Sequence, residues 1–380
     1  MGSFTKMTPT TSFESPSMGR LISFLKYTFI WKTGRSALGT IIFTVVYTLA
    51  FVYLINIFYR LALPNPDFIT FLCYSIFPLG IFKITLFTLR FKEWSRLVSY
   101  FSKVELDALG DSKKYSKITI KFISYVRFII LLFTLAAVGS NIVLVLRLWI
   151  SNIVFRPQLL KYFNTALPFD ENTDVGFYLD LITQTLFMEM GAMYEILWDL
   201  LVFGGLVFFI GQFKALKLRC ESALDVNDDE VCLKNIVDCH THYVELINTK
   251  MFNSLTSPVM FIYLLGITVN LAIAIIGNQD SLAVQLSVIE FVVALMFQLL
   301  LLFGLANEIT VQSETCTYSV FKSEWVRSSP KVRRAVLLLG TGMCRRMVLT
   351  AGPFIDMSLE TYVAILRVSY SFYTILNSTS

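Results

Sequence analysis

The stretch Phe177–Gly211 decides the fold class, and it reads FYLDLITQTLFMEMGAMYEILWDLLVFGGLVFFIG. It is predominantly apolar over 35 residues, and as a helix it would extend roughly 50 Å. The hydrocarbon core of a bilayer is only about 30 Å thick. The stretch therefore predicts a membrane-crossing helix that either tilts strongly or continues into the cytoplasm and packs on a neighbour there.

Six further stretches are long and apolar enough to cross a bilayer, because a crossing helix needs about 20 mostly apolar residues. A shorter stretch, Leu21–Trp31, is interrupted by Lys26 and predicts a helix lying at the membrane interface. Together with the first stretch, the sequence predicts an all-α membrane protein of seven spans. The six other spans are expected at Ser36–Phe58, Phe68–Leu89, Phe122–Leu146, Pro258–Gly277, Leu282–Leu305 and, in broken form, Ala335–Ile375.

The composition supports a membrane protein and excludes several other classes. Of the 380 residues, 55% are hydrophobic and only 16% are charged, whereas a soluble domain is about a quarter charged. The mean hydropathy is +0.65. These values exclude a disordered chain, a dedicated nucleic-acid-binding protein and an ordinary soluble enzyme. The sequence also contains no Walker loop, nucleophile elbow or metalloprotease motif, so we expect neither an enzyme nor a cofactor.

The basic residues predict the orientation. The four segments on one side of the predicted spans carry 25 Lys and Arg residues, and the segments on the other side carry 4. Because cytoplasmic loops hold the excess of Lys and Arg, the N-terminus is expected in the cytoplasm. Seven crossings then place the C-terminus outside, which is the opposite of a rhodopsin-like receptor.

No metal site is expected from the cysteines and histidines. Five of the six cysteines fall on the predicted cytoplasmic side, where disulfides are rare. His240 and His242 lie near Cys232 and Cys239, but this spacing matches no standard zinc site. Loop thiols and helix-face imidazoles are the expected roles.

Several charged residues lie inside the predicted spans, where an unpaired charge is costly. Lys83, Arg127 and Asp199 are expected to pair or to reach the interface with their side chains. Arg367 must pair as well, with Glu195 or Glu290 as candidates, and it is expected to point into its own subunit. The remaining intramembrane acids, Glu189 and Glu290, either touch a ligand cavity or face the bundle interior.

The seventh span is expected to be broken. Proline at Ala351-Gly-Pro353 interrupts a helix, and Asp356 or Ser358 can cap a new helix that runs to Leu376. One face of this terminal helix carries Ser369, Tyr373, Leu376 and Asn377. Such a face either lines a water-filled pore or packs against neighbouring helices.

Helical patterns also continue beyond the spans, at Val231–Met251 and Asn307–Trp325. They predict a small helical body under the membrane that makes subunit contacts. The expected division of the chain is an N-terminal arm (1–35), spans one to four (36–211), a cytoplasmic anchor loop (212–257), spans five and six (258–306), a second anchor segment with the first part of helix seven (307–351) and a terminal helix (352–380).

The C-terminal third resembles the insect odorant receptors, and the resemblance is most specific from Gln298 to Leu376. The N-terminal third matches that family in topology alone, and the second cytoplasmic loop lacks the long insertion of the family's co-receptor. The motifs that carry the resemblance are Ser313-Glu314, Tyr318, Ser323-Glu-Trp325, Leu349-Thr-Ala-Gly352, Ser358-Leu-Glu-Thr-Tyr362, Ile365-Leu-Arg367 and Ser369-Tyr-Ser-Phe372.

The resemblance implies a ligand-tuning subunit of an odorant-gated, non-selective cation channel. Such a subunit joins the co-receptor in a heterotetramer in the plasma membrane of an olfactory neuron dendrite. The terminal helices line a central pore for monovalent and divalent cations. A small volatile ligand binds in the outer half of spans two to six and stabilises the open state.

The expected ligand cavity is apolar and aromatic, because volatile ligands are small and carry little charge. Each nominated residue could instead pack against a helix or face lipid. A gustatory-type channel and, less favoured, a G-protein-coupled receptor are the alternatives for the whole chain. The nominated ligand-binding residues are Phe71, Tyr74 and Ser75 in span two, Gly139 and Ile142 in span three, and Phe187, Met188 and Gly191 in span four.

Overall fold

The structure is a computed structural model that describes residues 16–61, 68–110, 113–154, 173–226, 228–247, 250–276 and 282–379. Within these ranges it gives the backbone alone for 68–76, 113–118, 151–154, 269–276, 282–288, 372–379 and some single positions. The described chain is almost entirely helical and includes one antiparallel pair of short strands.

The elements follow the chain as a series of long helices joined by short connections. They are α1 (Gly19–Tyr27), α2 (Ala37–Leu61), α3 (Phe68–Leu89), α4 (Phe91–Gly110), α5 (Lys113–Val154), α6 (Asp174–Glu221), α7 (Asp229–Ile247), α8 (Lys250–Ile276), α9 (Leu282–Glu314), α10 (Cys316–Phe321), the 3-10 helix η2 (Trp325–Arg327), α11 (Pro330–Gly342), β1 (Thr350–Ala351), β2 (Ile355–Asp356) and α12 (Leu359–Thr379).

Helix α6 is the centre of the molecule. It begins at Thr173, whose side chain accepts a hydrogen bond from the backbone N–H of Gly176 at 3.1 Å. Its 48 residues correspond to about 72 Å of helix. Every residue from Leu197 to Phe213 is buried, and α6 packs against α1, α3, α5, α7, α9 and α10. A helix that is apolar on all sides is stable only when other elements surround it, and the middle of α6 is enclosed in this way.

The seven predicted spans are all helical and correspond to α2, α3, α5, α6, α8, α9 and α12. Several are longer than expected, since their polar ends continue the helix beyond the apolar stretch; α5, for example, has 42 residues. Within the part of the chain that is described, four helical stretches pass a test of length and hydropathy for crossing a membrane. They are Ala37–Tyr59, Asp174–Glu221, Asp229–Thr268 and Val292–Arg327.

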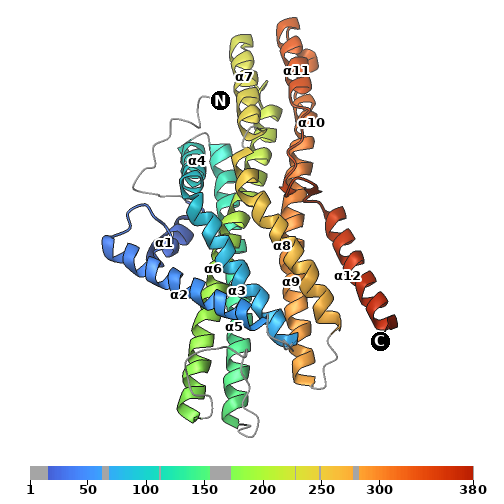
Figure 1. The fold of residues 1–380 in the computed structure, drawn as a ribbon. Coiled ribbons are helices and arrows are strands. Elements are labelled where there is room, and N and C mark those ends of the chain that lie inside the picture. Colours follow the sequence, from blue (N-terminus) through green and yellow to red (C-terminus); the bar gives the residue numbers. More distant parts are fainter. Residues whose placement is uncertain are drawn as a thin grey trace.

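One end of the bundle carries a helical body, as the sequence predicts. Helices α7, α10 and α11 extend together at this end, whereas the C-terminal end of α12 lies towards the other (Figure 1). The amphipathic helix α4 also belongs to this region and was not predicted. It buries Trp94, Leu97, Val98 and Phe101 at helical spacing, but its charged residues hide it from a search for long apolar stretches.

The seventh span is broken, as the sequence predicts, but its first helix already ends at Gly342, before Ala351-Gly-Pro353. Strands β1 and β2 form a hairpin between α11 and α12, with Gly352 in the left-handed region at φ +67°. Helix α12 then starts at Ser358, whose hydroxyl accepts a hydrogen bond from the N–H of Thr361 at 3.2 Å. Because the new helix has its own N-cap, α12 is oriented independently of α11 (Figure 1).

Candidate ligand-binding region and pore helix

A buried cluster of charged and polar side chains joins three helices inside the bundle. The ammonium of Lys83 on α3 lies 2.8 Å from Asp199 Oδ1 and 3.3 Å from Glu195 Oε1, both on α6. The second carboxylate oxygen of Asp199 accepts a hydrogen bond from Gln298 Nε2 on α9 at 2.5 Å. Lys83 and Asp199 are both 0% exposed. The predicted pairing of these two residues is confirmed.

Two aromatic rings enclose the same ammonium. Lys83 Nζ lies 4.4 Å from the ring centroid of Tyr263 on α8 and 5.2 Å from that of Trp198 on α6. Cations within about 6 Å of an aromatic face are attracted by the ring quadrupole. The cluster therefore connects α3, α6, α8 and α9 through one cation, and its geometry is fixed from several directions.

The other two basic residues expected in spans behave differently. Arg127 on α5 is exposed and donates to the backbone carbonyl oxygen of Pro16, with its Nη2 at 2.6 Å. Arg367 on α12 is exposed as well. The predicted pair of Arg367 with Glu195 is wrong, because Glu195 contacts Lys83 instead. The side chain of Glu290 lies outside the described residues.

A cavity of about 310 Å³ lies on a different side of α6, between α6, α5 and α1. It is open to the surface, where Phe24 and Ile142 are 47% and 51% exposed. Most of its wall is apolar, as a site for a small apolar ligand requires. The polar lining groups are Arg20, Thr134 and Glu189, and the apolar ones are Leu21, Phe24, Ile130, Val138, Ile142, Ala192, Met193, Ile196, Leu197 and Leu200.

The nominated residues of span three lie at or beside this cavity. Ile142 lines it, and so does Val138, the neighbour of Gly139. A Cβ atom on Gly139 would meet no atom within 4 Å, so the backbone there borders open space.

None of the nominated residues of span four is among the residues that line this cavity. Phe187 stacks on Tyr53 of α2 with ring centroids 4.3 Å apart, and Met188 is buried in the core. Gly191 contacts α3 so closely that a Cβ atom would lie 2.6 Å from the ring of Phe77. The structure therefore places these residues in the packing between helices and does not bring them to the described cavity.

The nominated residues of span two, Phe71, Tyr74 and Ser75, lie in α3 where the side chains are outside the described residues.

Most residues of the cavity wall were not predicted from the sequence. A usable signal was present, because the α5 residues follow a spacing of four and the α6 residues follow helical spacing. The α5 residues are Ile130, Thr134, Val138 and Ile142, and the α6 residues are Glu189, Ala192, Met193, Ile196, Leu197 and Leu200.

The pore-helix nominations lie on α12, which packs against α8 and α9. Ser369 is buried, and its hydroxyl donates to the carbonyl oxygen of Ile365 at 3.0 Å. The side chains of Tyr373, Leu376 and Asn377 lie outside the described residues.

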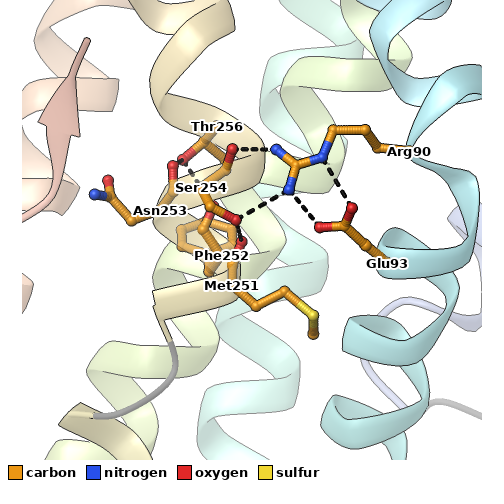
Figure 2. Close-up of polar contacts among 7 residues, drawn as sticks. All are labelled: Arg90, Glu93, Met251, Phe252, Asn253, Ser254 and Thr256. Atoms are coloured by element: carbon orange, nitrogen blue, oxygen red, sulfur yellow. Dashed lines mark hydrogen bonds and ion pairs between the residues drawn. The ribbon is translucent and has the colours of Figure 1, made fainter. Parts of the chain in front are cut away.

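A polar contact attaches the junction of α3 and α4 to α8. The guanidinium of Arg90 donates to the carbonyl oxygen of Ser254 and, at 3.2 Å, to its hydroxyl. The same group pairs with Glu93, with Nε 3.1 Å from Oε1. Figure 2 shows Arg90 approaching α8 from one side, with the side chain of Asn253 pointing to the other.

That other side of α8 holds the hairpin before α12. The backbone N–H of Thr350 donates to Asn253 Oδ1 at 3.0 Å, and the N–H of Gly352 donates to the carbonyl oxygen of Ser257 at 3.0 Å. The same short part of α8 therefore contacts both the α3–α4 junction and the segment that leads into the terminal helix.

The cysteines and histidines of the anchor helices form no metal site within the described ranges. His242 lies on α7. Burial, together with the positive charge of Arg219, lowers the pKa of His242 to about 4. It is therefore neutral at physiological pH.

Comparison with known proteins identifies the family. A sequence profile described as 7tm Odorant receptor matches residues 65–370. Odorant receptor 46a, isoform B, of Drosophila melanogaster is 25% identical over 194 residues, covering 48% of this chain and 50% of the relative. Odorant receptor 23a of the same species is 26% identical over 236 residues, covering 59% and 60%. The chain thus spans about half or slightly more of the length of these relatives.

The fold matches a solved insect receptor over nearly its full length. The structure of the olfactory receptor OR5 from Machilis hrabei in complex with eugenol superimposes with a TM-score of 0.83, covers 96% of this chain and 98% of that one, and is 16% identical. The structure of the same receptor described without eugenol gives a TM-score of 0.82. The chain is a multi-pass membrane protein with the seven-helix receptor fold, and it belongs to the 7tm Odorant receptor family.

Proposed function

We propose that this chain is the ligand-tuning subunit of an odorant-gated, non-selective cation channel. The observation that carries the proposal is the family match over residues 65–370. The short second cytoplasmic loop supports a tuning subunit over the co-receptor. Its partner is then the co-receptor in a heterotetramer in the plasma membrane, in the dendrite of an olfactory neuron.

The ligand is a small, weakly polar volatile that reaches the bundle through the lipid. The cavity between α1, α5 and α6 supports this class, since it is about 310 Å³, mostly apolar and open at the exposed side chains of Val138 and Ile142. Pockets for small molecules begin at about 300 Å³. The nominated residues of α3, Phe71, Tyr74 and Ser75, are proposed as a separate part of the binding region, in the outer half of the bundle.

Gating follows if the ligand binds the open arrangement better than the closed one. The connected elements on the path are α6, the cluster around Lys83, α8 and the hairpin at Gly352. The hairpin leads directly into α12, the proposed pore helix with Ser369, Tyr373, Leu376 and Asn377. A change in the position of α8 would therefore move the start of α12 through the hydrogen bonds at Asn253 and Ser257.

The proposed orientation has the N-terminus in the cytoplasm and the C-terminus outside. It is supported by the split of basic residues, 25 to 4. The anchor helices α7, α10 and α11 then lie in the cytoplasm, and the C-terminal end of α12 lies towards the outside (Figure 1).

The test is whole-cell current under a broad odorant panel, recorded with and without the co-receptor and with surface expression measured. Fast cation current is expected only when both chains are present. Current from this chain alone would instead favour a self-sufficient, gustatory-type channel. Access of antibody to a C-terminal tag in intact cells checks the orientation separately.

A further inference from the structure

A second, larger groove lies at the end of α8 near the anchor body. It has a volume of about 990 Å³ and runs between the first turns of α8 and residues 345–353, the segment before α12. Its polar end is formed by Lys250, Arg345 and Arg346. None of the residues that line it is acidic.

The three basic side chains are exposed and available to a ligand. Within the described residues, no carboxylate lies within ion-pair distance of any of them. Nearby Arg90, by contrast, is paired with Glu93. The groove therefore presents three uncompensated positive charges in one place.

The other end of the groove is apolar. Phe261 and Ile262 on α8 and Leu349 and Pro353 on the opposite wall line it. Along α8, Phe261 lies 11 residues beyond Lys250, which corresponds to about 17 Å of helix. The lining therefore changes from cationic to apolar along the bundle, over a length comparable with a lipid headgroup and the start of its chains.

We propose that this groove binds an anionic phospholipid whose headgroup carries more than one phosphate. The phosphates contact Lys250, Arg345 and Arg346, and an acyl chain follows Phe261 and Ile262. Basic pockets between membrane helices on the cytoplasmic side recognise such headgroups, and arginine binds phosphate oxygens with two parallel hydrogen bonds. A lipid with one negative charge would leave the other cations unpaired.

Three features favour a membrane lipid over a soluble phosphate compound or an acidic peptide. The apolar wall is continuous with the cationic end, α8 continues from it as a membrane span, and Ile262 is 39% exposed where that span begins. The inference uses the orientation given under the proposed function. It does not depend on the chain being odorant-gated, because lipid binding is measured without channel activity.

The experiment uses the full chain purified in detergent with its co-receptor. Fluorescent phosphatidylinositol 4,5-bisphosphate is titrated, and binding is read by anisotropy. Arg345→Gln with Arg346→Gln should weaken binding about 25-fold, since each basic residue near an anionic lipid contributes about a factor of five. The co-receptor is unchanged throughout, so the difference reports on this groove.

Matched variants separate the groove from a general charge effect. Arg333→Gln with Arg334→Gln removes two adjacent exposed arginines from α11, outside the groove, and should leave the affinity unchanged. Arg345→Lys with Arg346→Lys should retain most of it. Thermal unfolding of each complex checks that the variants are folded.

Three outcomes would overturn the proposal. Equal losses in the groove and α11 double variants would indicate non-specific attraction. Equal affinity for phosphatidylcholine would exclude recognition of the headgroup. Full competition by soluble inositol trisphosphate at the concentration of the lipid would show that the apolar wall contributes nothing, and the ligand would then be a soluble phosphate compound.

Discussion

The two sides of helix α6 make different kinds of contact with the elements around them. One side carries Glu195 and Asp199 into ion pairs with Lys83 and a hydrogen bond with Gln298. The other side carries Ala192 and Ile196 to an apolar cavity beside α5 and α1. Directional, buried polar contacts tolerate little change, whereas an apolar cavity is defined mainly by shape.

This difference separates the residues that hold the bundle together from those that select the ligand. Substitutions on the polar side should affect whether the bundle forms, and substitutions on the cavity side should affect which ligand binds. Substitutions on each side of α6, and on α12, test this division.

The largest effect is expected for Asp199→Ala. It removes the closest partner of a fully buried ammonium, and breaking a buried pair in this way costs about 3–5 kcal/mol. We expect loss of most surface expression and a clear fall in the thermal stability of the purified complex. Fluorescence-detected size-exclusion after heating gives the second readout.

The matched control is the double variant Asp199→Ala with Lys83→Met. With the ammonium gone, no buried cation is left without its closest partner, and Glu195, the carboxylate that also loses Lys83, is partly exposed, so part of the lost stability should return. If the double variant is as unstable as the sum of both single changes, the ion pair is not what holds this side together.

A smaller loss is expected for Gly80→Ala on α3, which faces the same side of α6. A Cβ atom at Gly80 would lie 2.2 Å from the backbone oxygen of Gly191, so the two helices must move apart. Overpacking of this kind costs about 1–3 kcal/mol. Thermal unfolding of the complex measures it. Gly139→Ala is the control, since nothing lies within 4 Å there, and a similar loss in both variants would refute the packing argument.

On the cavity side, Ala192→Leu should change potency and leave stability nearly intact. The added atoms fill part of a cavity of about 310 Å³, and each methylene that a pocket cannot accommodate costs about 1–3 kcal/mol of binding. The concentration–response curve for an active odorant should shift by at least about tenfold. Leu186→Ala, at an α6 side chain that is 66% exposed, should shift it little. Unchanged potency in Ala192→Leu would place the ligand elsewhere.

The seven spans, a fourth span too long for the bilayer, a break before the terminal helix and the need of Lys83 and Asp199 to pair or to reach the interface could all be predicted from the sequence. Each depends on a quantity that the chain carries locally, such as a run of apolar residues or the cost of an unpaired charge. Which side of α6 packs against α3 does not depend on such a local quantity. Both sides of a membrane helix are apolar, so amphipathicity gives no direction.

This explains the outcome for Phe187 and Gly191. Their depth in the span suits a ligand cavity, but depth does not determine the direction in which a side chain points. The structure turns them towards α2 and α3 and turns Ala192 and Met193 towards α5. Helix α4 could not be found by hydropathy for a related reason, because only one of its faces is apolar and it lies outside the spans.

The smallest effect on potency is expected on α12, away from both sides of α6. Tyr373→Ala and Asn377→Ala should change the relative permeability of calcium and sodium, by about twofold, because polar and aromatic residues that line a pore control ion access. Reversal potentials in ion-substituted solutions measure this, and the odorant concentration–response curve should stay within about threefold of the unaltered channel. Leu359→Ala, at an exposed position in the first turn of α12, is the control for a general effect of changing the helix. If the odorant potency changes and the ion permeability does not, α12 contributes to ligand selection, and the pore is lined by another element.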